Sequence, residues 1–302
     1  MLQLSFFDSR VIPLNKIVIF GVGLIGGSLA ISIRQAHPAV EIVGLGRDGE
    51  LLHAATELGV IDRTAASIAE AMQDADLVVI ATPVAQIRAI LEAIAPHLQA
   101  HTIITDVGST KSDVLAYARQ ALPADYRGFV AGHPIAGAEK TGVTAAREGL
   151  FHHKHVVLTP DAHTSAQALQ SVQSLWESAG AKVVYMSAHQ HDAIFAAVSH
   201  LPHLLAFALV NELASRDNQV ELFRFAASGF RDFTRIAGSS PEMWRDITLA
   251  NRSALLAELD AYQKQLRQLQ TLIENQDSAG LLAMFEHASQ ARNTWAESLP
   301  SQ

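Results

Sequence analysis

The sequence predicts an α/β fold in which a parallel sheet is covered by helices on both faces and is followed by an all-helical second domain. Short apolar runs of strand length alternate with segments of helical spacing over the first part of the chain. The links between them are short, as in parallel strands joined by helices. After about Ser187, strand-like runs become scarce and helix-forming residues dominate. We therefore expect domains at residues 1–187 and 188–302.

The expected elements follow from local patterns along the chain. Strands are predicted at the apolar runs 16–20, 40–45, 77–81, 102–107, 156–159 and 182–186. Helices are predicted between them at 26–35, 50–58, 87–94 and 165–179. In the second domain, six apolar residues alternate in steps of four and three: Leu255, Leu259, Tyr262, Leu266, Leu269 and Ile273. This short heptad stripe favours an amphipathic core helix, and a dimer seam is the alternative.

Composition excludes several classes of protein. An apolar share of 49% in 302 residues is enough for buried cores. The net charge of −8 and the lack of a Lys/Arg cluster argue against a nucleic-acid partner. The absence of cysteine excludes disulfides and thiolate sites and is consistent with a cytoplasmic location. Apolar runs are shorter than the roughly 18 residues of a membrane span, and residues 1–10 lack signal-peptide features.

A dinucleotide site is predicted where the first strand ends. Gly21, Gly23 and Gly26 have the spacing G-x-G-x-x-G between a strand and a helix. The first glycine permits a tight turn, the second lets the backbone approach a pyrophosphate, and the third allows close helix packing. The helix N-terminus at Leu24 and Ile25 then turns free N–H groups toward the phosphates.

The residues after the second strand favour NADP over NAD. An NAD site carries an acidic residue about 20 residues beyond the glycines, and here Gly46 stands at that position, followed by Arg47. A guanidinium there can pair with a 2′-phosphate and stack on adenine. Asp48 leaves open that an NAD-binding acid comes slightly late, and a plain surface turn is a further alternative.

Two segments suggest hydride transfer assisted by a histidine base. Asp106, Gly108 and Ser109 follow a strand, and ligands bind beyond the carboxyl ends of parallel strands. Asp106 and Gly108 are therefore expected at the cofactor, while Ser109 either reaches the ligand or caps the next helix. His133 is expected in a loop framed by Gly132 and Pro134, where its imidazole can take the proton of a carbinol as hydride leaves the same carbon.

The helical part supplies candidates for a substrate pocket. His200 and His203 lie beside an apolar run and suggest a pocket wall, although solvated or core histidines are the alternative. Pro202 predicts that His203 lies near a helix start. Arg231 and Arg235 are four residues apart, and arginine is the usual bidentate partner of a carboxylate. Surface salt bridges of these arginines with Asp232 or Glu242 are the alternative.

A metal site is not predicted. His152, His153 and His155 are the histidines closest together in this part of the sequence. Their spacing on a loop or strand start lacks a clear ligand geometry for zinc.

Together these stretches resemble the prephenate and arogenate dehydrogenases of tyrosine biosynthesis, also called cyclohexadienyl dehydrogenases. The glycine motif alone is unspecific, whereas HPIAG, SHLPH and GFRDFTRIA together are highly specific. The matching stretches follow the family's order over nearly the whole chain: GVGLIGGS at 21–28, ATPV at 81–84, DVGSTK at 106–111, GHPIAG at 132–137, SHLPH at 199–203, FRDFTRIA at 230–237 and Trp244.

The resemblance implies a Rossmann domain, a helical domain that dimerises, an active site between them, and oxidative decarboxylation of prephenate or arogenate with NAD(P)+. The family's catalytic histidine falls on His133, its assisting serine on Ser109 and its carboxylate-binding arginine on Arg235. Other matching positions are the pocket residues His200, His203 and Trp244, the acidic residues Glu139 and Asp232, and Thr82 and Pro83 at the cofactor. Gly46 and Arg47 depart from relatives with an acid there.

Other functions fit less well. A β-hydroxyacid dehydrogenase resembles chains with a catalytic lysine early in the helical domain, whereas here that part holds only Lys264, which comes late. A non-catalytic NADP-sensing protein would not need Ser109, His133 and Arg235 together. No appended regulatory domain or chorismate mutase domain is expected. The sequence does not separate prephenate from arogenate, and it does not address inhibition by tyrosine.

Overall fold

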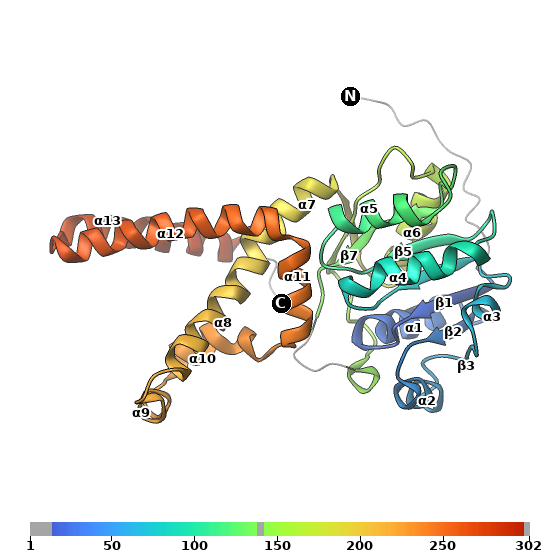
Figure 1. The fold of residues 1–302 in the computed structure, drawn as a ribbon, viewed down its shortest axis with the longest axis horizontal. Helices are drawn as coiled ribbons and strands as arrows, with labels where there is room; N and C mark the ends of the chain where they lie inside the picture. Colours follow the sequence, from blue (N-terminus) through green and yellow to red (C-terminus); the bar gives the residue numbers. More distant parts are fainter. Residues whose placement is uncertain (1–13, 138–141, 299–302) are drawn as a thin grey trace. The chain divides into compact units, whose positions relative to one another are not determined.

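The computed structural model describes residues 14–137 and 142–298, and its elements follow the predicted alternation of strands and helices (Figure 1). The sequence-based statements about residues 1–10 and Glu139 lie outside the described residues. Observed element boundaries differ from the predicted ones by three residues or fewer at the strands and helices that the sequence indicated.

The first sheet is entirely parallel, with the strand order β3-β2-β1-β4-β5-β6. This is the order of a dinucleotide-binding doubly wound fold, and the order reverses between β1 and β4. The strands are β1 (Lys16–Phe20), β2 (Glu41–Leu45), β3 (Arg63–Thr64), β4 (Leu77–Ile80), β5 (Ile103–Asp106) and β6 (Phe129–Val130).

Each central strand is apolar on both faces because each face is covered. Ile17 and Ile19 of β1 join one core with α1, whereas Val18 and Phe20 join a second core with α4 and α5. Successive side chains of a strand point to opposite faces, so a continuous apolar run fits a sheet covered on both sides. The helices are α1 (Leu24–Ala36), α2 (Gly49–Glu57), α3 (Ile68–Met72), α4 (Val84–Ile94), α5 (Ser112–Ala121) and α6 (Ala166–Ser178).

A second, three-stranded sheet extends this domain and was not predicted as a separate unit. It consists of β7 (Gly132–Pro134), β8 (His155–Leu158) and β9 (Lys182–Tyr185), with β7 antiparallel to β8 and β8 parallel to β9. The expectation that His133 lies in a loop is therefore wrong, because it pairs with Val157 within a short strand. Three residues, two of which are glycine and proline, carry too little pattern to indicate a strand.

One continuous helical run begins the helical part. It spans Ala188–Ala214 and comprises α7 (Ala188–Phe195), a π-helical segment (Ala196–His200) and α8 (Leu201–Ala214). Pro202 and His203 lie in the first turn of α8, as predicted, and α8 itself continues a longer helical run that was not predicted. Proline lacks an N–H group and its ring displaces the preceding turn, and the π-helical segment directly before it accommodates that change.

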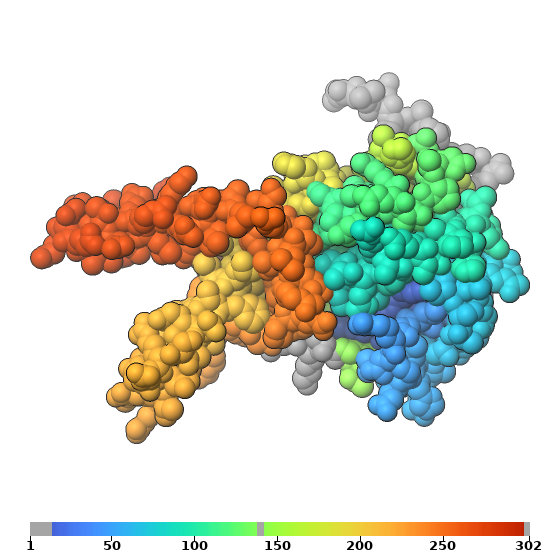
Figure 2. Space-filling view, viewed as in Figure 1, coloured from blue at the N-terminus to red at the C-terminus, as the bar shows by residue number. Residues whose placement is uncertain are grey.

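The remaining helices complete the helical part. They are α9 (Gln219–Arg224), α10 (Ser228–Thr234), α11 (Pro241–Ala250), α12 (Arg252–Glu274) and α13 (Ser278–Glu297). Trp244 and Ile247 of α11 join the core formed by α4 and α5, and α11 lies against α4 in Figures 1 and 2. By compactness the chain divides into two units, Met1–Arg252 and Ser253–Gln302.

The run Ala188–Ala214 is long and apolar enough, by length and composition alone, to cross a membrane. Its mean hydropathy reaches 1.9, yet only 22% of that window is buried in the described chain. The core helix of a soluble assembly passes the same test, so this feature by itself does not indicate a membrane protein.

Two neighbouring glycines should respond differently to an added methyl group. A Cβ on Gly21, whose φ is +90°, would lie 2.7 Å from the carbonyl oxygen of Ala81, whereas a Cβ on Gly23 would meet nothing within 4 Å. We expect Gly21→Ala to lower the free energy of unfolding by about 1–3 kcal/mol. Gly23→Ala should change it by less than about 1 kcal/mol. Urea unfolding of both variants checks this, and equal stabilities would contradict it.

Candidate active site

A pocket of about 480 Å³ opens at the carboxyl ends of β1, β4 and β5. This is the point where the strand order reverses, and ligands bind at such points in open α/β sheets. The lining brings together residues from several predicted stretches: Gly23, Leu24 and Ile25; Ala81, Thr82, Pro83 and Val84; Val107, Gly108 and Ser109; His133, Pro134, Ala136 and Gly137; Gly142; and Ser239, Ser240, Met243 and Ile247.

The glycine turn fits a dinucleotide pyrophosphate. Gly23 is open on the side where a Cβ would stand, and it precedes α1 as an N-cap without a side-chain hydrogen bond. The first N–H groups of α1 therefore remain available to an anion. Gly26 packs so closely that a Cβ would lie 2.3 Å from the carbonyl oxygen of Gly21. Nearby, the buried Thr82 hydroxyl has no hydrogen-bond partner in the described structure.

Of the two charged side chains after the end of β2, Asp48 accepts backbone hydrogen bonds, whereas Arg47 is exposed. The Asp48 carboxylate accepts the N–H groups of Glu50 (3.0 Å) and Leu51 (3.1 Å) as the N-cap of α2. Arg47 is exposed in the preceding turn. The turn therefore presents a guanidinium, while the neighbouring carboxylate already accepts two backbone hydrogen bonds.

Ser109 and His133 line the same pocket, although 24 positions separate them in the sequence. The alternative that Ser109 caps the following helix is wrong. Helix α5 begins at Ser112, its N-cap position is Lys111, and no local side chain caps it. The carboxylate of Asp192 instead accepts the N–H groups of Lys111 (2.9 Å) and Ser112 (2.8 Å). Ser109 is left partly exposed at the pocket.

His133 is the first member of a chain of hydrogen bonds. Its Nδ1 lies 2.8 Å from Nε2 of His191, and Nδ1 of His191 lies 2.9 Å from Oδ1 of Asp192. Phe195 packs against both rings, with centroid distances of 5.0 Å to His133 and 4.5 Å to His191. His191 is fully buried, so the sequence-predicted base is connected to the protein interior.

Asp106 lies beneath the pocket and is absent from its lining. It is fully buried and forms an ion pair with the equally buried Lys111. Its carboxylate also accepts the N–H groups of Gly108 (2.8 Å) and Gly132 (3.1 Å). Lys111 donates to the carbonyl oxygen of Gly132 as well (2.7 Å). The two side chains therefore hold the backbone next to His133, and Asp106 has a structural place rather than a position facing the cofactor.

Burial keeps the site histidines neutral. Burial, followed by unfavourable electrostatic interactions with His191, Lys111 and His200, lowers the pKa of His133 well below its ordinary value. Burial also lowers the pKa of His191, although the hydrogen bond to Asp192 opposes this. For Asp192, burial acts upward, but hydrogen bonds from His191, Ser112 and Lys111 outweigh it and lower the pKa to about 2. A neutral His133 is in the protonation state that a general base requires.

A second group of aromatic rings stands beside this chain. The imidazole of His203 stacks on Trp244 with ring centroids 3.7 Å apart, and Nδ1 of His203 donates to the carbonyl oxygen of Ser199 (2.8 Å). Burial lowers the pKa of His203, and the nearby Arg235 guanidinium acts in the same direction. Arg235, His203 and Trp244 are thus neighbours, although none of the three lines the pocket that contains His133.

His200 is almost completely buried and contacts Asn251 and Trp244. Nδ2 of Asn251 donates to Nδ1 of His200 (3.1 Å) and to the backbone carbonyl of Asp192 (2.8 Å). The rings of His200 and Trp244 make a T-shaped contact with centroids 6.0 Å apart, and His200 is absent from the pocket lining. Its burial favours a supporting role over direct contact with a ligand.

Two further predicted positions, Asp232 and Arg235, lie on one surface segment. Asp232 and Arg235 are exposed on the segment formed by α10 and the following 3-10 turn (Arg235–Gly238). Glu139 lies outside the described residues. Within the described ranges, no group of three or more His, Cys, Asp or Glu side chains is placed to hold a metal ion.

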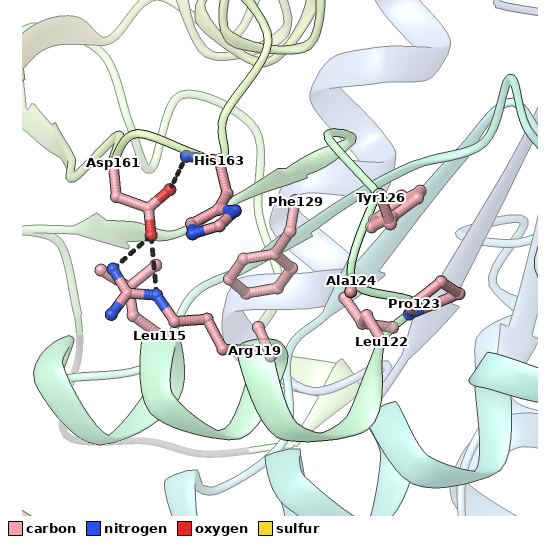
Figure 3. A pocket seen from close by; sticks show the side chains of 10 residues that line it. Leu115, Arg119, Leu122, Pro123, Ala124, Tyr126, Phe129, Asp161 and His163 are labelled. Atoms are coloured by element: carbon pink, nitrogen blue, oxygen red, sulfur yellow. Dashed lines mark hydrogen bonds and ion pairs between the residues drawn. The ribbon is translucent and has the colours of Figure 1, made fainter.

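A separate hollow of about 170 Å³ lies between α5 and the segment around Asp161 (Figure 3). Its walls are largely apolar, and its rim carries the ion pair of Arg119 with Asp161 (2.6 Å). It shares no residue with the pocket that contains His133. We assign no chemistry to it.

Sequence reasoning missed His191, Asp192, Asn251 and the function of Lys111. His191 lies 58 residues beyond His133, and nothing local marks it among fourteen histidines. The one available signal was the adjacent pair His191-Asp192 just after the Ser187 N-cap, since a carboxylate beside a histidine can orient its ring.

Comparisons with family models cover most of the chain. The model described as the prephenate dehydrogenase nucleotide-binding domain matches residues 29–185. The model described as the prephenate dehydrogenase dimerization domain matches residues 187–287.

Individual relatives support the same grouping. The chain is 42% identical to prephenate dehydrogenase of Bacillus subtilis, covering 92% of this chain and 76% of the relative. It is 37% identical to cyclohexadienyl dehydrogenase of Zymomonas mobilis, covering 92% and 95%. Among solved structures, prephenate dehydrogenase of A. aeolicus with hydroxyphenyl propionate and NAD+ has a TM-score of 0.89 at 36% identity, covering 94% and 99%. Arogenate dehydrogenase of Synechocystis has a TM-score of 0.78 at 32% identity, covering 93% and 99%.

The buried His200 should make stability depend on pH. Burial, followed by an unfavourable electrostatic interaction with His191, lowers the pKa of His200 from 6.5 to about 4. Between pH 6.5 and pH 4, His200 is largely protonated in the unfolded chain but largely neutral in the folded chain. The free energy of unfolding therefore falls as pH falls through this range. The loss from this residue should reach about 3 kcal/mol near pH 4. Urea unfolding of His200→Gln should show a shallower decline from pH 7 to 4, whereas His189→Gln, at an exposed position, should keep the parent's slope. An unchanged slope in His200→Gln would contradict the assignment.

Proposed function

Because the chain belongs to the prephenate dehydrogenase family, we propose that it catalyses the oxidative decarboxylation of prephenate, arogenate or both with a pyridine dinucleotide as hydride acceptor. The observation that carries this proposal is that a neutral, partly exposed His133 lines one pocket with Ser109 and the glycine turn. A hydride acceptor and a proton acceptor can therefore act on the same carbinol.

The reaction uses these residues in a simple way. The bound nicotinamide supplies the hydride acceptor. His133 takes the proton of the C4 hydroxyl, and Ser109 hydrogen-bonds that hydroxyl and holds it in place. The ring carboxylate then leaves as CO2, the electrons of the broken bond complete an aromatic phenolate, and this phenolate takes up a proton to become the phenol. Aromatisation makes the step effectively irreversible.

Arg235 is proposed as the partner of the substrate's ring carboxylate. Its proximity to His203 places a positive charge next to the stacked His203–Trp244 pair. A guanidinium binds a carboxylate through two parallel hydrogen bonds, which fixes orientation as well as position. We place the substrate's side chain near His203, and Asp232 near Arg235, as the family resemblance implies.

For the cofactor we propose a preference for NADP over NAD. Gly46 stands where an NAD site would carry an acid, Arg47 is exposed, and Asp48 accepts the hydrogen bonds that begin α2. These observations support a 2′-phosphate at Arg47. The structure of the A. aeolicus relative contains NAD+. We therefore propose that this chain differs from that relative in its preferred cofactor.

We further propose a cytoplasmic homodimer formed through the predicted helical domain 188–302. Helix α8 is apolar around its circumference, yet only Leu201 and Ala206 are buried. Helices that are apolar all round are normally buried. Leu266 and Ile273 of the heptad stripe are also about half exposed in the single chain. A second copy covering these side chains explains the apolar run Ala188–Ala214 without a membrane.

The decisive assay combines two substrates and two cofactors. The purified protein is incubated with prephenate or arogenate and with NAD+ or NADP+, while the reduced cofactor is followed by absorbance and the product by chromatography. Formation of 4-hydroxyphenylpyruvate or tyrosine supports the proposal. Failure of all four combinations in a folded dimer would refute it.

His133→Asn tests the base. We expect kcat to fall by about 10²-fold or more with little change in KM, since only proton removal is lost. In the parent, the lowered pKa of His133 should keep kcat/KM on its plateau below pH 6.5, with activity lost only as pH falls through that lowered pKa. Initial rates from pH 5 to 9 check both points. A midpoint at or above pH 6.5 would show that His133 is not the neutral base described.

Arg47→Ala tests the cofactor preference. Removing a guanidinium that pairs with a phosphate should lower kcat/KM for NADP by about 10- to 100-fold. The value for NAD should stay within about twofold. Steady-state kinetics with both cofactors decides it, and equal effects on NAD and NADP would contradict the assignment.

A further inference from the structure

We propose that His191 and Asp192 are positioning residues that fix the tautomer of His133, so that its Nε2 is the basic nitrogen presented to the substrate. The polarity of each hydrogen bond in the chain Asp192–His191–His133 leads to this conclusion. The tautomer is a property of the protein alone, whereas its use in catalysis rests on the function proposed above.

The direction of each hydrogen bond in the chain follows from the charge of Asp192. Its two carboxylate oxygens accept the backbone N–H groups of Lys111 (2.9 Å) and Ser112 (2.8 Å). These are at the N-terminus of α5, where the helix dipole favours a negative charge. An ionised carboxylate can only accept hydrogen bonds. Nδ1 of His191, 2.9 Å from Oδ1, must therefore carry a proton and donate it.

The proton on Nδ1 of His191 in turn decides the direction of the hydrogen bond between His191 and His133. This side chain is fully buried, and a neutral imidazole carries one proton, so its Nε2 is an acceptor. Nδ1 of His133 lies 2.8 Å from that Nε2 and must be the donor. Nε2 of His133, across the ring from Nδ1, is then left without a proton. The reverse polarity would require either a protonated Asp192 or a doubly protonated His191 in the interior.

Surrounding contacts keep the chain in this geometry. Phe195 packs against both imidazoles, and Asn251 donates to the backbone carbonyl of Asp192 (2.8 Å). His133 is also held through its backbone neighbour Gly132 by Lys111 and Asp106. Rotation of either ring would therefore break a hydrogen bond of the chain Asp192–His191–His133.

The arrangement also stabilises the state that follows proton transfer. The carbinol proton binds to Nε2 of His133, and the Nδ1 proton remains in its bond to His191. The positive charge that develops on His133 faces a hydrogen-bond chain that ends on the Asp192 carboxylate. No other bond is made or broken in the protein.

The tautomer can be measured directly without substrate. In protein labelled with 15N-histidine, the His133 resonances are assigned by their loss in His133→Asn. We expect Nδ1 to show the shift of a proton-bearing nitrogen and Nε2 that of a bare one. A proton on Nε2 in the parent protein would overturn the proposal.

Kinetics of variants test whether the hydrogen-bond chain Asp192–His191–His133 contributes to catalysis. His191→Leu removes the acceptor, and we expect kcat to fall by at least about tenfold with KM within about threefold. His191→Gln keeps an oxygen at the place of Nε2, so it should recover at least half of the lost kcat on a logarithmic scale. His189→Gln, at an exposed position of the same helix, is the matched control with parental kinetics.

Each result decides the inference separately from the overall function. A folded His191→Leu variant with parental kcat, or a His191→Gln variant no better than His191→Leu, would overturn the proposed positioning role. If His191→Leu does not fold, the resonances of His133 in the parent and in His191→Gln decide. An inactive parent that shows a bare Nε2 on His133 would refute the proposed function and leave the tautomer intact.

Discussion

The position of His133 depends on one buried ion pair. Asp106 and Lys111 have no exposed side-chain surface, and together they bind both the N–H and the C=O of Gly132, the residue before His133. Buried ion pairs add little net stability, because both charges lose their hydration. What this pair supplies is geometry, since a three-residue strand has few bonds of its own. It fixes the end of β5, the start of α5 and the backbone of His133 relative to one another.

Much of the fold could be predicted because its information is local. The strands of the parallel sheet are continuous apolar runs, and the glycine turn between β1 and α1 has a recognisable spacing. The strand β7 could not be predicted, because three residues, two of which are glycine and proline, show no periodicity. The continuity of α7 with α8 was missed because proline usually marks a helix start, whereas here a π-helical segment accommodates it.

The candidate site was predictable only in part, for a similar reason. Ser109 and His133 each follow a glycine in a conspicuous stretch of sequence, and the structure brings both to one pocket. His191, Asp192 and Asn251 act through contacts between residues that are distant in sequence, so no spacing reveals them. Asp106 shows the opposite case: its place after a strand suggested cofactor contact, but its carboxylate is occupied by the protein. The domain boundary and the individual roles of the site residues stay predictions.

The π-helical segment Ala196–His200 has a consequence for how one helix serves two purposes. An α-helix turns by about 100° per residue, so one extra residue within a turn rotates every later side chain by that amount. His191 and Asp192 precede this offset, and His203 follows it. The upstream half can therefore face α5 and the base, while the downstream half presents His203 to Trp244. In a regular helix of the same length these two sets of side chains would be out of phase with their partners, so shortening the segment by a single residue would disconnect the stacked rings from the hydrogen-bond chain.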